Sequence, residues 1–73
     1  MSDLTLKDIE CMGSRIQGDI DLYLEVNAPE GETLLYFKSF DNLKKYVKEN
    51  YNEDLTHKGN SKKKILAVRI WRK

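Results

Sequence analysis

Residues of the kinds that perform catalysis are few, and their spacing does not assemble a reaction centre. His57 is the only histidine and Cys11 the only cysteine in the chain. A histidine base needs a nucleophile or a paired carboxylate within hydrogen-bond reach, in a pocket that excludes water. His57 falls in a polar segment, so we expect it to be solvated. Cys11 has acidic and apolar neighbours, so we expect a small buried hydrophobe. The sequence predicts no catalytic residue and no enzyme.

Asp19 and Asp21 are separated by one residue, which places both carboxylates on one face of a strand. Such a pair can share a divalent cation if a third oxygen ligand converges on it. No further ligand is evident, one cysteine and one histidine cannot form a structural zinc site, and the four glycines do not form a phosphate-binding loop. We expect no metal and no cofactor. The aspartates are expected to be solvated, or paired across strands with Arg69 or Lys73.

Charge is strongly segregated along the chain although the net charge is only +1. Residues 1–54 carry six basic and twelve acidic side chains (−6), whereas residues 55–73 carry seven basic side chains and no acidic one (+7). Segregation of this kind is typical of a segment that contacts a partner. It is equally compatible with intramolecular neutralisation, in which the acidic part of the fold lies against the basic strand. The sequence leaves both interpretations open.

The first functional hypothesis is nucleic-acid binding, or binding to a complex that handles nucleic acid, through the basic C-terminal loop and strand. Lysine and arginine neutralise phosphates, and an aromatic ring beside an arginine offers a stacking platform for a base. The residues that would form this site are Lys58, Lys62, Lys63, Lys64, Arg69, Trp71, Arg72 and Lys73.

The alternative hypothesis is a protein-binding regulator or inhibitor that uses an acidic strand face and exposed tyrosines. The strand residues proposed for this role are Asp19, Asp21, Tyr23 and Glu25. Tyrosine suits interfaces because it combines a large contact area with one polar tip, although in so small a domain tyrosines can also wall the core. The small size, lone cysteine and lack of a catalytic constellation resemble accessory proteins of bacteria and their phages.

Hydrophobic periodicity predicts the elements that must position these residues. Period-two alternation over 20–26 predicts a strand whose core face is Ile20, Leu22, Leu24 and Val26; turn residues follow, and a second strand to about residue 38 completes a hairpin. Residues 40–51 have the pattern of an amphipathic helix capped by Ser39. Residues 65–71 alternate again, with Leu66, Val68 and Ile70 expected to face the core.

Two segments are less defined. Residues 4–12 fit either a helix or a strand; Thr5 and Asp8 have capping-box spacing, and Gly13 is placed to end a short helix. Residues 52–64 have little apolar content and predict a flexible basic loop. The expected fold is a single small α+β domain over residues 1–73, with a three- or four-stranded antiparallel or mixed sheet packed by one main helix, in the order (α or β)ββαβ.

Length and composition limit the class of protein further. The chain has 73 residues, 40 % of them hydrophobic and 34 % charged, which suits a folded domain with a small core. No apolar run approaches the roughly 20 residues of a membrane span. One cysteine permits no internal disulfide, so we expect a reducing, cytoplasmic location, no contact with membrane, and a monomer or weak homodimer.

Overall fold

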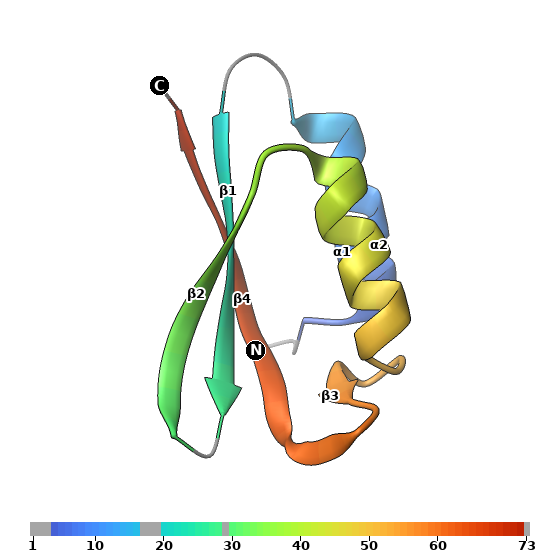
Figure 1. The fold of residues 1–73 in the computed structure, drawn as a ribbon. Helices are drawn as coiled ribbons and strands as arrows, with labels where there is room; N and C mark the ends of the chain where they lie inside the picture. Colours follow the sequence, from blue (N-terminus) through green and yellow to red (C-terminus); the bar gives the residue numbers. More distant parts are fainter. Residues whose placement is uncertain (1–3, 17–19, 29, 73) are drawn as a thin grey trace.

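The computed structural model describes residues 4–16, 20–28 and 30–72 and shows two layers, with both helices on one face of a four-stranded sheet (Figure 1). The elements in chain order are α1 (Leu6–Met12), the short 3₁₀ helix η1 (Gly13–Arg15), β1 (Ile20–Ala28), β2 (Gly31–Phe37), α2 (Phe40–Asn50), β3 (Thr56–His57) and β4 (Asn60–Arg72). The strands are all antiparallel, in the order β2-β1-β4-β3. The predicted small α+β fold with one main helix is confirmed.

The first segment is a helix, and its capping box sets its start. Thr5 Oγ1 accepts from the Asp8 amide at 3.2 Å, and Asp8 Oδ2 accepts from the Thr5 amide at 3.0 Å, so two amides at the helix start are bonded reciprocally. Ile9 faces the core and is fully buried. The prediction that Cys11 is buried is wrong, because its side chain is exposed. Cys11 follows Ile9 by two residues, and a helix turns by about 100° per residue, so the Cys11 side chain points about 200° away from that of Ile9.

Gly13 does not end α1 in the left-handed conformation that its type suggested. Its φ of −56° is right-handed, and the chain continues into η1. The requirement for glycine is instead steric, since a Cβ here would lie 2.7 Å from Cε2 of the Phe40 ring. Phe40 begins α2, so the missing side chain lets the end of α1 approach the start of α2.

Helix α2 covers β1 and β2 and supplies much of the core. Ser39 Oγ accepts from the Asn42 amide at 3.3 Å as the N-cap, and Leu43 and Val47 are fully buried. The two helices are also joined at the surface by an ion pair of 3.0 Å between Lys48 Nζ and Glu10 Oε1. The predicted helix over 40–51 is therefore confirmed to within one residue at its C-terminal end.

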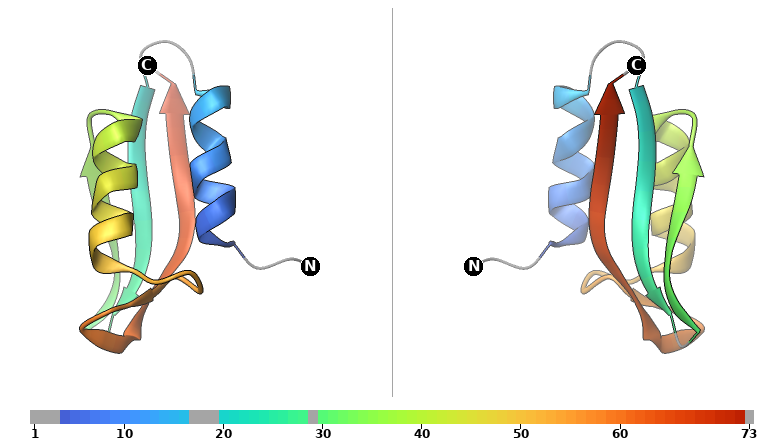
Figure 2. Two further views of the ribbon diagram at one scale, coloured as in Figure 1. Left: turned by 90° about the vertical axis from the view of Figure 1, so that its right-hand side faces the viewer. Right: turned by 90° about the vertical axis from the view of Figure 1, so that its left-hand side faces the viewer.

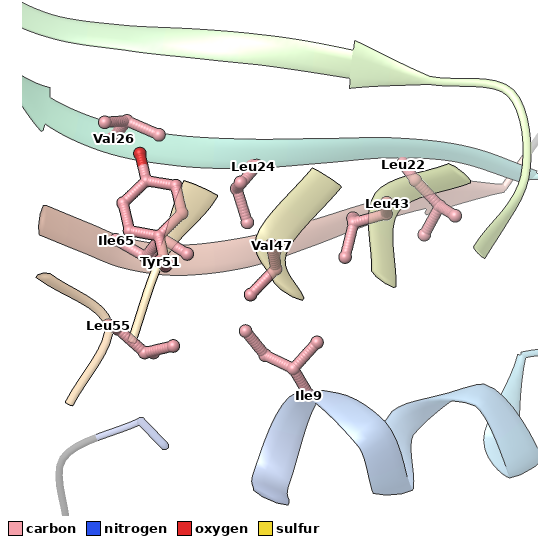
Figure 3. Close-up of a cluster of buried hydrophobic side chains, with 9 residues drawn as sticks. All are labelled: Ile9, Leu22, Leu24, Val26, Leu43, Val47, Tyr51, Leu55 and Ile65. Carbon is pink, nitrogen blue, oxygen red and sulfur yellow. The ribbon is translucent and has the colours of Figure 1, made fainter. Parts of the chain in front are cut away.

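The core lies between the sheet and the helices, as Figure 3 shows. Leu22, Leu24 and Val26 point from β1 toward the helices, which confirms three of the four positions predicted for this strand's core face; Ile20 packs against the cluster but is only partly buried. Among the residues whose burial the structure describes, nine form the buried core: Ile9, Leu22, Leu24, Val26, Leu43, Val47, Tyr51, Leu55 and Ile65. The β1–β2 hairpin closes at the pair Ala28–Gly31, where Gly31 has a φ of +123° that favours glycine.

The predicted core face of the C-terminal strand is wrong at Leu66, and Ile70, although on the helix side, is 45 % exposed and not part of the core. Ile65, not Leu66, is buried: Ile65 is 3 % exposed and Leu66 is 40 % exposed. A register shift explains the difference, because Glu25 pairs with Ala67 whereas Val26 pairs with Ile65, which leaves Leu66 as the extra residue of a bulge. An extra residue changes which face each later side chain takes, so simple alternation fails there.

The segment 52–64 was predicted to be a loop, but much of it is strand. β3 forms at Thr56–His57, and β4 begins at Asn60, five residues before the predicted strand. Lys64 pairs with both Asn27 and Thr56, so backbone pairing on two sides holds a stretch that has few strand-forming side chains. Leu55, fully buried, has a φ of +64°, and its carbonyl accepts from the Ile65 amide at 3.2 Å.

The bulge generates a matched pair of substitutions. We expect Ile65→Ala to lower the free energy of unfolding by about 2–5 kcal/mol, because it leaves a cavity in the core. Leu66→Ala, one residue away, should cost less than about 1 kcal/mol. Urea denaturation of the two variants measures both values, and a larger loss for Leu66→Ala would contradict the register described here.

A second expectation concerns Tyr51, which is 2 % exposed. Burial, and secondarily the neighbouring Tyr46 phenol, raises the pKa of Tyr51 to about 12 from 10.0. Below pH 10 folded and unfolded chains both hold the proton, whereas between pH 10 and 12 the unfolded chain loses it first. The free energy of unfolding should therefore fall as pH rises through this window, by about 1.4 kcal/mol at pH 11. Urea denaturation at pH 8 and pH 11 measures this change in the free energy of unfolding. Tyr51→Phe is the control, because it keeps every other titrating group. An equal decrease in the free energy of unfolding in both proteins would refute the expectation.

Candidate binding face of the sheet

The helices cover one face of the sheet, and the other face carries no element in the described part of the chain (Figures 1 and 2). Side chains that alternate with the core residues of β1 point to this second face, together with their partners on the two neighbouring strands. We call this surface the open face. Its central residues are Asp21, Tyr23 and Glu25 of β1, Leu34 and Tyr36 of β2, and Ala67, Arg69 and Trp71 of β4.

Three aromatic rings gather at one end of the open face. Tyr23 lies at the centre, with its ring centroid 4.6 Å from that of Trp71 in an edge-to-face arrangement and 5.3 Å from that of Tyr36. Contacts of this geometry stabilise aromatic pairs beyond the area that they bury. One strand from the middle of the sheet and one from each side thus contribute to a single cluster.

Polar contacts hold the remaining side chains of the open face in place. The Tyr36 hydroxyl donates to Asp21 Oδ1 at 3.1 Å. Arg69 Nη2 donates to both carboxylate oxygens of Glu25, at 3.2 and 3.4 Å. The cross-strand pairing of acidic β1 residues with Arg69, predicted as one of two possibilities, is therefore present at Glu25.

Much of the apolar surface of this face remains in contact with solvent. Leu34, Tyr36 and Trp71 are each between 46 % and 48 % exposed, and Tyr23 is half-buried beneath its neighbours. A hollow lined by Glu25, Glu32, Thr33 and Leu34 adjoins the aromatic cluster. Apolar groups gathered on one surface and bordered by polar ones mark interaction sites in soluble proteins.

The residues predicted for nucleic acid are divided in the structure, with Arg69 and Trp71 on the open face and others elsewhere. Lys64 pairs with Asn27 and so lies on the side of the open face, whereas Lys62 is exposed and Lys63 half-buried in a stretch where the register with β3 is irregular. Lys58 Nζ donates to the Lys48 carbonyl at 3.2 Å near the end of α2, and Arg69 is paired with Glu25. Lys73 lies outside the described residues, as does the side chain of Arg72.

The structure brings together three of the four residues predicted for protein binding. Asp21, Tyr23 and Glu25 lie together on the open face, while Asp19 lies outside the described residues. The sequence analysis missed Leu34, which no charge or motif marks. Its only signal is its position next to Leu35 in a strand, where neighbouring side chains point to opposite faces. The sequence analysis also treated four tyrosines alike, although the structure buries Tyr51 in the core and half-buries Tyr46 against it.

The described residues offer little for catalysis or metal binding. His57 is half-buried in β3 rather than solvated in a loop; its ring lies edge-on to Tyr51 at 5.3 Å, and its Nδ1 accepts from the Gly59 amide at 3.0 Å. These contacts assign it a structural role in the β3–β4 turn. No group of three histidine, cysteine, aspartate or glutamate side chains that could hold a metal occurs among the described residues.

Neither the family models, nor the curated proteins, nor the solved structures that were compared with this chain gave a match. In the part of the chain that the structure describes, no helix has the length and apolar content to cross a membrane.

The accessibility of the open face can be measured through Trp71, the only tryptophan. We expect acrylamide to quench its fluorescence readily in the folded protein, because its side chain is about half exposed. Tyr23→Ala removes its edge-to-face partner and should increase quenching further, whereas Tyr46→Ala, on the helix side, should not. Strong protection of Trp71 in the parent would show that the open face is already covered, for example by self-association.

Proposed function

We propose that this protein is a non-enzymatic binding protein that docks a protein partner on the open face of its sheet. The single observation that carries the proposal is the cluster of Tyr23, Tyr36 and Trp71 with Leu34, exposed on a face that no described element covers. Tyrosine and tryptophan are the residues most enriched at the energetic centres of protein interfaces. We propose a cytoplasmic location, because Cys11 is an exposed free thiol and a reducing compartment keeps such thiols reduced.

Electrostatics favours a protein partner over nucleic acid. Asp21 and Glu25 are part of the open face, and Glu32 lines the adjoining hollow, so phosphates approaching the aromatic cluster would meet carboxylates. The one guanidinium at the centre, that of Arg69, is already bonded to Glu25. Nucleic-acid binding depends on cations that are available to replace the counterions of phosphates, and here they are divided between surfaces.

The same charges indicate what kind of protein surface would fit. The apolar centre of the open face would be matched by an apolar patch on the partner. The carboxylate of Glu32 at the hollow beside Leu34 would be matched by lysine or arginine at the border of that patch. We therefore propose a partner that carries an apolar patch with a basic rim.

Nucleic acid remains the second candidate, and one observation favours it. Aromatic rings displayed on an antiparallel sheet can stack unpaired bases, and Lys64 extends from the same side of the sheet as Trp71 and Tyr23. Single-stranded nucleic acid would be the form recognised, because only unpaired bases expose the ring faces that stack.

Two matched double variants separate these candidates. Leu34→Ser with Tyr36→Ser removes apolar area from the open face, and Lys62→Glu with Lys64→Glu reverses two charges and leaves that area intact. We expect a partner captured from cell extract by the immobilised parent to bind at least tenfold more weakly to the serine variant. The loss with the lysine variant should be smaller, and binding should change little between 0.1 and 0.5 M salt, as an apolar interface predicts.

Fluorescence anisotropy with labelled single- and double-stranded oligonucleotides, at low and physiological salt, completes the test. Binding that weakens steeply with salt and is lost in the lysine variant would transfer the assignment to nucleic acid. Retention of the captured partner by the serine variant would refute docking on the open face. Circular dichroism must show that both variants keep the parent fold.

A further inference from the structure

The edge of the sheet at β4 is open over most of its length. Among the residues that the structure describes, β3 pairs with β4 only at Asn60 and Lys64, and no strand lies beside Leu66–Arg72 on the side away from β1. We call this stretch the β4 edge. A strand at the edge of a sheet presents unpaired backbone groups that can accept another strand.

The register identifies which backbone groups point outward. The β1–β2 hairpin closes at the pair Ala28–Gly31, which are separated by two residues, so this pair exchanges hydrogen bonds. In an antiparallel ladder every second pair does the same. The backbone amides and carbonyls of the even-numbered residues of β1 therefore point toward β2. The odd-numbered residues of β1 then bond β4, at Ala67, Arg69 and Trp71. The amides and carbonyls of Val68 and Ile70 must therefore point away from β1, into the open edge.

The helix layer extends past this edge. Figure 2 shows α1 beyond β4 on the side away from β1, and Figure 1 shows it in the same layer as α2. The outer edge of β2 is also open in the described part of the chain, but α2 lies over β1 and β2, and no helix of that part extends beyond β2 (Figure 2). Only at β4 would an added strand be covered by a helix on one face.

Side chains at the β4 edge indicate what the added strand would contain. Ile70 pairs with Leu22, so it faces the helix side, yet it is 45 % exposed because no neighbouring strand covers it. Val68, on the same side, is only partly buried. Arg69 faces the open side, where it is bonded to Glu25, and residues 55–73 include no acidic side chain, so β4 itself contributes positive charge and no carboxylate to this edge.

We propose that the β4 edge binds an extended segment of a partner protein as a fifth strand, with apolar residues at alternate positions and acidic residues between them. The apolar residues would lie beside Val68 and Ile70 beneath α1, and the acidic residues would lie beside Arg69 on the open side. This rests on the proposed role in protein binding but uses a surface distinct from the centre of the open face. It adds main-chain hydrogen bonds, which the open face alone does not offer.

A second copy of this chain is the less suitable occupant. Two β4 edges related by a two-fold axis would bring a second α1 into the space beside β4 that the first α1 covers (Figure 2). A short segment from another protein brings no such helix. The edge therefore favours a peptide strand over self-pairing.

The probe is a fluorescein-labelled ten-residue peptide of alternating valine and glutamate, with two control peptides. One control alternates valine and lysine, and the other has the first peptide's composition with its valines in one block. We expect saturable anisotropy with the first peptide and at least tenfold weaker binding of both controls. Amide hydrogen exchange should be fast at Val68 and Ile70 in the free protein and slow when the peptide is bound, with Arg69 slow in both states.

Substitutions at one position separate the backbone from the side chain. Ile70→Pro removes an outward amide that β1 does not use, whereas Ile70→Thr keeps that amide and a β-branched side chain. We expect the proline variant to lose peptide binding and the threonine variant to retain most of it. Equal binding by the proline variant would overturn the proposal, as would no binding by the parent, or exchange at Val68 that is already slow without peptide.

The exchange measurement needs only the parent protein, so it decides the question even if Ile70→Pro fails to fold. The serine variant of Leu34 and Tyr36 should keep the peptide, since neither residue lies on β4. If the peptide fails to bind while a captured partner still depends on Leu34 and Tyr36, the β4 edge proposal alone is wrong. If the peptide binds and no partner depends on those two residues, docking on the open face is wrong.

Discussion

Burial of Leu22, Leu24 and Val26 against two helices is the constraint on which the other features depend. Because side chains of a strand alternate between faces, packing these three inward directs Tyr23 and Glu25 outward. Their cross-strand partners on β2 and β4 must follow to the same side. In the described part of this 73-residue chain, both α-helices lie on one side of the sheet, which leaves the second face open. The open face is thus a geometric consequence of how the core is built.

Much of this arrangement could be predicted from the sequence because its signals are local. The alternation around Leu22 and the amphipathic pattern around Leu43 each report a property of neighbouring residues, and the structure bears out both. The capping spacing of Thr5 left helix and strand both open for residues 4–12, and the structure has the helix. The bulge at Leu66 could not be predicted, because it arises from the register between β1 and β4, which are far apart along the chain. The early start of β4 at Asn60 has the same origin, since pairing on both sides overrides weak local propensity.

The candidate site shows the same division. Aspartate and tyrosine on β1 could be assigned to one outward face by counting, but their association with Trp71 depends on the order of the strands. That order also explains why charge counted along the sequence overstated the basic surface. Arg69 belongs to the basic C-terminal segment, yet its neighbour in space is Glu25, and Lys63 is half-buried whereas Lys64 is exposed. Charges that are separated along the sequence are therefore partly neutralised in the fold, because the basic strand β4 lies beside the acidic strand β1.

The open face and the β4 edge meet at the end of β4, where one strand serves both. Trp71 belongs to the aromatic cluster, and the preceding residue, Ile70, directs its backbone groups into the edge. A strand added there would place its outward side chains next to Arg69 and Trp71 and so enlarge the open face by one strand. It would also cover Ile70, which the helices leave exposed. A single partner could therefore use main-chain hydrogen bonds at the edge for register and apolar contacts on the face for affinity, which would link the two surfaces in one interface.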